Sequence, residues 1–297
     1  GAFLGDMRKL CDVYRTGRLA VSIELFPPKT PQGEATLFEH VAQLVEFAPS
    51  FITCTYGAAG STQDATLGIV VRVHREFQLP VATHLTCVGA TSDQLRDYLR
   101  RAADAGVQNV VALRGDPPRG DAKFRPVPGG FSYANELVSL VRREFAGFGI
   151  AVAGYPETHQ EAPSPQVDLE NLQRKVAAGA DVVITQLFYE NADFFTFRER
   201  CQELGIRVPI VPGLLPITNF AQVKRITALC GAKLPQKLVA GLEAAGEDTD
   251  KQFELGVEFA IRQTQELVDA GVPGIHFYVL NRSEAAARVL SAVRLPS

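Results

Sequence analysis

The chain has 297 residues, of which 46% are hydrophobic, and its 30 basic and 33 acidic side chains give a net charge of -3. Such a chain can bury a sizeable core, and a near-neutral charge without a Lys- or Arg-rich run argues against nucleic acid as the main partner. No apolar run reaches the ~18 residues of a membrane span and no signal-peptide pattern is present, so the sequence predicts a soluble, cytoplasmic protein without membrane contact.

Eight short apolar runs follow one another along the chain. They are largely continuous in hydrophobicity and rich in β-branched residues, which is typical of parallel strands buried on both faces. The runs cover residues 21–26, 51–56, 81–88, 109–115, 150–155, 181–188, 208–213 and 274–280.

Longer segments of helical period separate these runs. Residues 134–145, for example, place apolar side chains at helical spacing, and glycines at positions 106, 179, 205 and 271 are typical helix stops. Eight strand–helix units without a break in composition predict one (β/α)8 TIM barrel over residues 1–297, as a single domain. The alternative, a doubly wound sheet, would normally carry a glycine-rich fingerprint after its first strand, and residues 26–31 contain no glycine.

Residues 117–132 break the alternation. Four prolines and three glycines in this stretch exclude a helix or a strand. Because long structureless loops in compact domains are usually functional, we expect 117–132 to be an active-site loop.

Cysteine and histidine spacing argues against a metal site. The five cysteines are scattered and form no C-x-x-C pair, and the five histidines show no metal-ligand spacing. A disulfide framework is therefore not expected, and the sequence predicts no metal.

Polar residues recur at the ends of the predicted strands. Any one of them could simply reach solvent, but their recurrence predicts that they meet at the mouth of the barrel, where the catalytic face of this fold lies. They are Glu24, Thr55, His84, Arg114, Gly115, Asp116, Tyr155, Gln186 and Arg282.

Glu24 is the most informative of these residues, because it stands in an otherwise apolar run. As a structural residue it could form an ion pair with Arg282 or Lys29. As a functional residue it would have a raised pKa and donate a proton at neutral pH. The functional interpretation is favoured because Pro27 and Pro28 stiffen the chain that directs Glu24. Asp116 also precedes two prolines and has a competing explanation as a turn residue.

A helix that begins near Asp168 carries Asp168, Asn171 and Lys175 on one face. Such a polar face is usually solvated surface. It follows Tyr155 and His159, however, which could lie against a planar ligand that extends over this helix. The residues alone predict a barrel enzyme that binds a sizeable polar ligand and uses at least one carboxylate.

Eight segments together resemble methylenetetrahydrofolate reductase of the bacterial type, in order and over nearly the whole chain. The resemblance implies an FAD-containing barrel in which NADH or NADPH reduces the flavin and leaves, after which methylenetetrahydrofolate accepts the hydride in a ping-pong reaction. The segments are SIELFPPKTPQGE, ITCTYGAAGST, THLTCVG, NVVALRGDPP, AGYPETH, ADVVITQLFY, PIVPGLLPITNF and HFYVLNR.

The resemblance also implies roles for individual residues. Glu24 matches the general acid, and Asp116 matches a carboxylate beside flavin and pterin. Gln186, Gln222 and Arg282 match folate contacts, although ordinary capping or surface roles are open for the two glutamines. The positions that match FAD contacts are Thr55, Tyr56, His84, Arg114, Gly115, Asp116, Tyr133, Ala134, Tyr155, His159, Ala162, Asp168, Asn171, Arg174 and Lys175.

One position departs from the family pattern. Many bacterial relatives have an aromatic residue where this chain has Ile226, so apolar contact with a ligand is expected there without ring stacking. Two alternatives stay open: a folate-binding barrel that transfers a methyl group, and a flavin-carrying subunit of an electron-transfer complex. A homo-oligomer is also open.

Overall fold

The structure of the chain is a computed structural model that describes residues 8–56, 63–114 and 124–296. Gly115 and Asp116 lie outside these ranges, as do residues 117–123 of the expected active-site loop. Their predicted roles therefore stay predictions.

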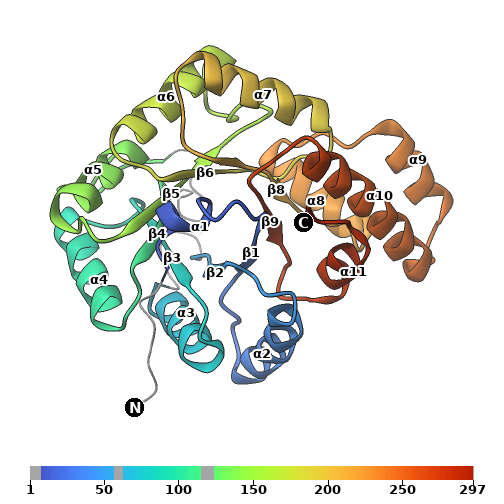
Figure 1. Ribbon diagram of the computed structural model, residues 1–297, viewed down its shortest axis with the longest axis horizontal. Helices are drawn as coiled ribbons and strands as arrows, with labels where there is room; N and C mark the ends of the chain where they lie inside the picture. The colour runs from blue at the N-terminus through green and yellow to red at the C-terminus, as the bar shows by residue number, and fades with distance from the viewer. Residues whose placement is uncertain (1–7, 57–62, 115–123, 297) are drawn as a thin grey trace.

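Nine parallel strands form the centre of the molecule, in the order β7-β6-β5-β4-β3-β2-β1-β9-β8. Helices surround this ring of strands (Figure 1), which confirms the predicted (β/α)8 barrel. The strands are β1 (Ala20–Leu25), β2 (Phe51–Cys54), β3 (Val81–Thr86), β4 (Asn109–Leu113), β5 (Gly149–Gly154), β6 (Val182–Thr185), β7 (Ile210–Val211), β8 (Gly213–Leu214) and β9 (Gly274–Tyr278).

The seventh predicted run is divided into two short strands, β7 and β8. Pro212 separates them, because proline has no backbone N–H to donate to the ladder. β7 pairs with β6 and β8 pairs with β9, while the carbonyl of Pro212 still accepts a hydrogen bond of 2.9 Å from His276 N. The two pieces together occupy one barrel position and close the ring.

The helices cover the outside of the barrel, as Figure 1 shows. Four of them end at the predicted glycine stops, since Gly106, Gly179, Gly205 and Gly271 all have positive φ. The helices are α1 (Leu10–Val13), α2 (Pro31–Val45), α3 (Gln63–Phe77), α4 (Ser92–Asp104), α5 (Ala134–Glu144), α6 (Pro165–Ala177), α7 (Asn191–Glu203), α8 (Phe220–Cys230), α9 (Gln236–Ala244), α10 (Thr249–Asp269) and α11 (Glu284–Ala292).

The short helix α1 closes the amino end of the barrel. Leu10 and Val13 are buried together with Phe51 and other side chains inside the barrel. The backbone N–H of Leu10 donates to Oδ1 of Asn109, the first residue of β4, at 2.9 Å. This end of the interior is therefore filled by apolar side chains. A ligand-binding site is expected at the opposite end, where the strands have their carboxyl ends.

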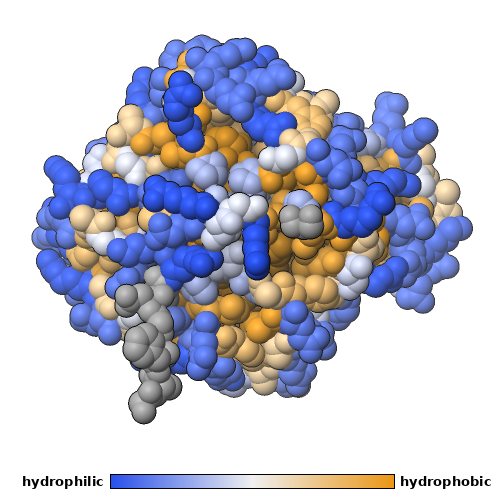
Figure 2. All heavy atoms as spheres, viewed as in Figure 1, coloured by the Kyte–Doolittle hydropathy of each residue, from blue (hydrophilic) through white to orange (hydrophobic). Residues whose placement is uncertain are grey.

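Figure 2 shows hydrophilic residues over the outer helices and hydrophobic residues gathered toward the centre of the same view. Most of the buried apolar side chains lie between the barrel and its helices, for example Ile23, Leu25 and Val41. Among the helices that the structure describes, none is long and apolar enough to cross a membrane.

Candidate active site

Glu24, near the end of β1, lies in a cluster with two histidines at the carboxyl end of the barrel. Its side chain is 17% exposed. The Oε1 atom lies 3.1 Å from Nε2 of His276 on β9 and 3.4 Å from Nε2 of His84 on β3. Within the described residues, the ion-pair partners of Glu24 are these imidazoles rather than Arg282 or Lys29. The structural alternative with those two partners is therefore wrong.

The pKa of Glu24 is shifted in the direction opposite to the prediction. Burial raises it, but hydrogen bonds and charge from His276 and His84 outweigh burial and lower the pKa to about 2. The prediction of a raised pKa is wrong, because the sequence did not show that two strands bring imidazoles to the same oxygen. Glu24 is thus an ionised carboxylate at neutral pH.

His276 connects Glu24 to the interior of the barrel. Its ring is fully buried, with Nδ1 2.7 Å from Oγ of Ser22 and Nε2 next to Glu24. Tyr278 packs edge-on against this ring and donates a hydrogen bond of 2.6 Å to the carbonyl of Thr185.

Neither His276 nor Ser22 was predicted as a site residue. A signal for His276 was present, since a histidine within the apolar run 274–280 is as unusual as the glutamate within 21–26. The β1–β9 register then places Ser22 opposite His276.

The residues predicted to hold a planar ligand come together at the ends of β5 and α6. The rings of Tyr155 and His159 meet edge to face at 4.6 Å. Lys175 Nζ lies 5.7 Å from the centre of the Tyr155 ring, and Oδ2 of Asp168 accepts a hydrogen bond of 3.1 Å from His159 N. Two of the three residues of the predicted helix face, Asp168 and Lys175, therefore lie beside Tyr155 and His159, while Asn171 is exposed and accepts a hydrogen bond from Arg174.

Lys175 is a partly buried cation in this group. It donates to the carbonyl of Ala153 at 2.6 Å. Burial lowers its pKa to about 8, although Asp168 acts to raise it. Burial also raises the pKa of Asp168 and lowers that of His159. A bound anion would restore the full charge of Lys175.

The predicted folate contacts line two separate cavities. Gln222 and Arg282 line a cavity of about 1030 Å³, together with Tyr278 and Leu280. Gln186 lines a smaller cavity of about 330 Å³, whose walls include Tyr155, His159 and Ile226. Both cavities begin at strand ends, and the larger one has room for a drug-sized ligand.

The other predicted contacts lie apart from these two cavities. Arg114 forms an ion pair with Glu161. The Tyr56 ring packs edge-on against Tyr98 and lines a separate cavity of about 470 Å³. Of the remaining ones, Tyr133, Asn171 and Arg174 are exposed, and Thr55, Ala134 and Ala162 are partly buried.

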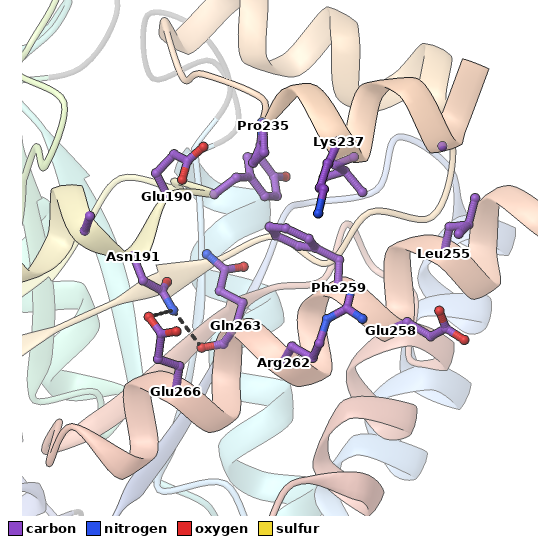
Figure 3. A pocket seen from close by; sticks show the side chains of 14 residues that line it. Glu190, Asn191, Pro235, Lys237, Leu255, Glu258, Phe259, Arg262, Gln263 and Glu266 are labelled. Carbon is purple, nitrogen blue, oxygen red and sulfur yellow. Dashed lines mark hydrogen bonds between the residues drawn. The ribbon is translucent and has the colours of Figure 1, made fainter. Parts of the chain in front are cut away.

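A further cavity, of about 750 Å³, lies between the start of α7, helix α9 and one face of α10 (Figure 3). Phe259 and Gln263 of α10 lie opposite Pro235 and Lys237 in this view. The predicted site residues line other parts of the described surface, so this cavity is not included in the candidate site.

A closed parallel barrel with an acid–base cluster and ligand-sized cavities at its carboxyl end defines a barrel enzyme. Within the described residues, no group of three or more side chains could hold a metal ion.

Comparison with known proteins identifies the family. A sequence model of the family described as methylenetetrahydrofolate reductase matches residues 9–294. The 5,10-methylenetetrahydrofolate reductase of Escherichia coli is 40% identical over 268 residues, which cover 90% of this chain and 88% of that protein. Methylenetetrahydrofolate reductase (NADH) 1 of Arabidopsis thaliana is 39% identical over 95% of this chain and 49% of its own length. The chain belongs to the methylenetetrahydrofolate reductase family.

The chain spans about half the length of the plant relatives it matches. Among solved structures, an uncharacterised protein from Clostridium thermocellum that binds two copies of 5-methyl-5,6,7,8-tetrahydrofolic acid has a TM-score of 0.64 at 15% identity. It covers 95% of both chains. At that identity the likeness supports the barrel fold alone.

Proposed function

We propose that the protein reduces methylenetetrahydrofolate to methyltetrahydrofolate with FAD as cofactor and NADH or NADPH as electron donor, in a ping-pong reaction. The observation that carries the proposal is the position of Glu24. It is a carboxylate at the mouth of the barrel, in contact with two imidazoles and within a family of folate reductases.

Glu24 acts as the general acid in this proposal. Ring opening of the substrate requires a proton, and His276 Nε2 shares its hydrogen bond of 3.1 Å with Glu24 Oε1. A folate that covers the mouth removes water from the carboxylate, which raises its pKa and favours the protonated acid. Imidazole and carboxylate together can therefore hold a proton and pass it to the substrate.

The described residues fit FAD. Lys175 is a partly buried cation whose pKa is lowered by desolvation, so an anionic diphosphate would stabilise its charged form. Tyr155 and His159 supply ring contacts beside it, and Asp168, Asn171 and Arg174 supply polar groups along α6. FAD would contribute the hydride carrier that no side chain provides.

The proposal is tested by anaerobic mixing of the purified holoenzyme with each nicotinamide in turn, followed by methylenetetrahydrofolate. We expect NADH or NADPH to bleach the flavin absorbance and the folate to restore it. A protein that purifies without flavin would favour the methyl-transferring alternative. Flavin that neither nicotinamide bleaches would favour the electron-transfer subunit.

Glu24→Gln separates the two halves of the reaction. Nicotinamide should still reduce the flavin, while reoxidation by the folate should slow by ~10²–10⁴ because a positioned acid is lost. Glu34→Gln, a change in an exposed glutamate of α2 that pairs with Arg72, is the matched control and should leave both rates unchanged. Equal folate rates in wild type and Glu24→Gln would remove Glu24 from the mechanism.

A further inference from the structure

The end of β1 is fastened to the chain after β9 by one amide side chain. Oδ1 of Asn281 accepts a hydrogen bond of 2.9 Å from Phe26 N, and its Nδ2 donates one of 2.8 Å to Phe26 O. Leu280 and Asn281 have φ of 48° and 59°, a backbone conformation that side-chain-bearing residues rarely adopt. Two such residues in succession persist only where surrounding contacts hold them.

The fastened residue, Phe26, extends the interior face of β1. Side chains alternate along extended chain, so Phe26 lies on the same face as Glu24, ~7 Å farther toward the mouth. Pro27 keeps Phe26 extended, because the residue before a proline is disfavoured in the helical region. The side chain of Leu25, between them, is buried in the outer core.

Phe26 is one of the few large apolar residues that the structure leaves exposed, at 42%. A single exposed phenylalanine is ordinary on a protein surface. This one, however, has both backbone groups bound by a side chain whose neighbours, Leu280 and Arg282, line the 1030 Å³ cavity of the predicted folate contacts.

We propose that Phe26 packs against the planar aromatic part of the folate substrate, and that Asn281 is a positioning residue that holds it there. This inference rests on the proposed function. An aromatic pair adds a modest, geometry-dependent contribution beyond apolar contact.

Substitutions of Phe26 test the contact through steady-state kinetics of the flavin-loaded enzyme. Phe26→Leu keeps an apolar side chain and should raise KM for methylenetetrahydrofolate about 2- to 10-fold with kcat nearly unchanged. Phe26→Ala should raise it further, and Phe26→Tyr should restore the wild-type value. Leu295→Ala, at another exposed apolar residue, is the control and should leave KM unchanged.

Asn281→Gly tests the positioning role. Glycine accepts the positive φ, so this change removes the two hydrogen bonds without adding backbone strain. We expect KM for the folate to rise as in Phe26→Leu, while the rate of flavin reduction by nicotinamide stays within twofold of wild type.

The double variant Phe26→Leu/Asn281→Gly provides the decisive comparison. Because both changes act on the same ring, KM of the double variant should equal that of the more affected single variant. Effects on KM that multiply would show that Asn281 acts through something other than Phe26. An unchanged KM in Phe26→Leu and Phe26→Ala would overturn the contact itself.

Failure of the inference and failure of the proposed function give different results. If wild type reduces methylenetetrahydrofolate but KM is insensitive to Phe26, the inference alone fails. If wild-type flavin is reduced by nicotinamide and never reoxidised by the folate, the proposed function fails. Thermal unfolding of each variant identifies any change in KM that comes from a damaged fold.

Discussion

The carboxylate of Glu24 keeps its charge in a mostly buried position because imidazoles from β3 and β9 reach the same oxygen. Its folded pKa of about 2 lies below the usual 4.5, so ionised Glu24 stabilises the fold above pH 4.5. That contribution is lost as pH falls toward 2.

Glu24→Gln should therefore flatten the acid side of the stability profile. Between pH 6 and pH 3, the free energy of unfolding of wild type should fall by about 2 kcal/mol more than that of the variant. Chemical denaturation at several pH values measures both. Parallel profiles would mean that the pKa of Glu24 is not lowered in the folded protein.

The lowered pKa of Lys175 leads us to expect that FAD binding depends on pH. Its pKa of about 8 lies below the usual 10.5 because the side chain is buried, and an anionic ligand favours the charged form. The affinity of the apoprotein for FAD should therefore fall about tenfold between pH 7 and pH 9. Quenching of FAD fluorescence on binding measures this affinity.

Lys175→Arg is the control for that experiment. Arginine stays protonated over this range, so the affinity of the variant for FAD should vary little between pH 7 and pH 9. An equal loss of affinity in both proteins would assign the pH dependence to another group.

At the residue scale, the sequence was enough to predict which residues belong to the candidate site, but not the direction in which the pKa of Glu24 is shifted. Glu24 stood out as a charge in an apolar run, and Asp168 and Lys175 could be placed on one helix face from their spacing alone. The sign of the Glu24 pKa shift could not be predicted. It depends on His84 and His276, which are distant in sequence and converge only when the barrel closes.

At the scale of elements, two helix glycines should respond in opposite ways to alanine. A Cβ at Gly256 in α10 would lie 1.9 Å from the backbone carbonyl oxygen of Ile217, so this helix packs directly on the chain after β8. Gly256→Ala should destabilise the protein by about 2 kcal/mol or more, since backbone cannot give way as a flexible side chain can.

Gly241 in α9 is the matched control, because the nearest atom to a Cβ there is Leu255 Cδ1 at 3.8 Å. Gly241→Ala should raise the free energy of unfolding by about 0.5–1 kcal/mol through helix propensity alone. Urea denaturation of the two variants compares them directly. Stabilisation by Gly256→Ala would contradict the close packing of α10.

The strands and most of the helices were predictable, but helices α1 and α9 and the division of one strand were not. Buried parallel strands read as continuous apolar runs, and glycine stops ended the helices where expected. The division of 208–213 into β7 and β8 was not predicted, although Pro212 stands within the run. A proline inside an apparent central strand argues for such a break.

At the scale of the molecule, the first and last strands pair, because β1 lies between β2 and β9. The ring is therefore completed only when both ends of the chain are folded, which favours the predicted single domain. Calorimetry should show one unfolding transition. Leu10→Ala, a change at a fully buried residue of α1, should lower the temperature of that same transition. A second transition at lower temperature would contradict a single domain.

The filled amino end of the barrel limits how ligands can reach the site. Leu10 and Val13 fill that end together with side chains of the strands, so a ligand of Glu24 has to approach from the carboxyl end of the barrel. A nicotinamide and a folate would then have to take turns. An excess of either compound should inhibit binding of the other, and each product has to be released before the next ligand can bind.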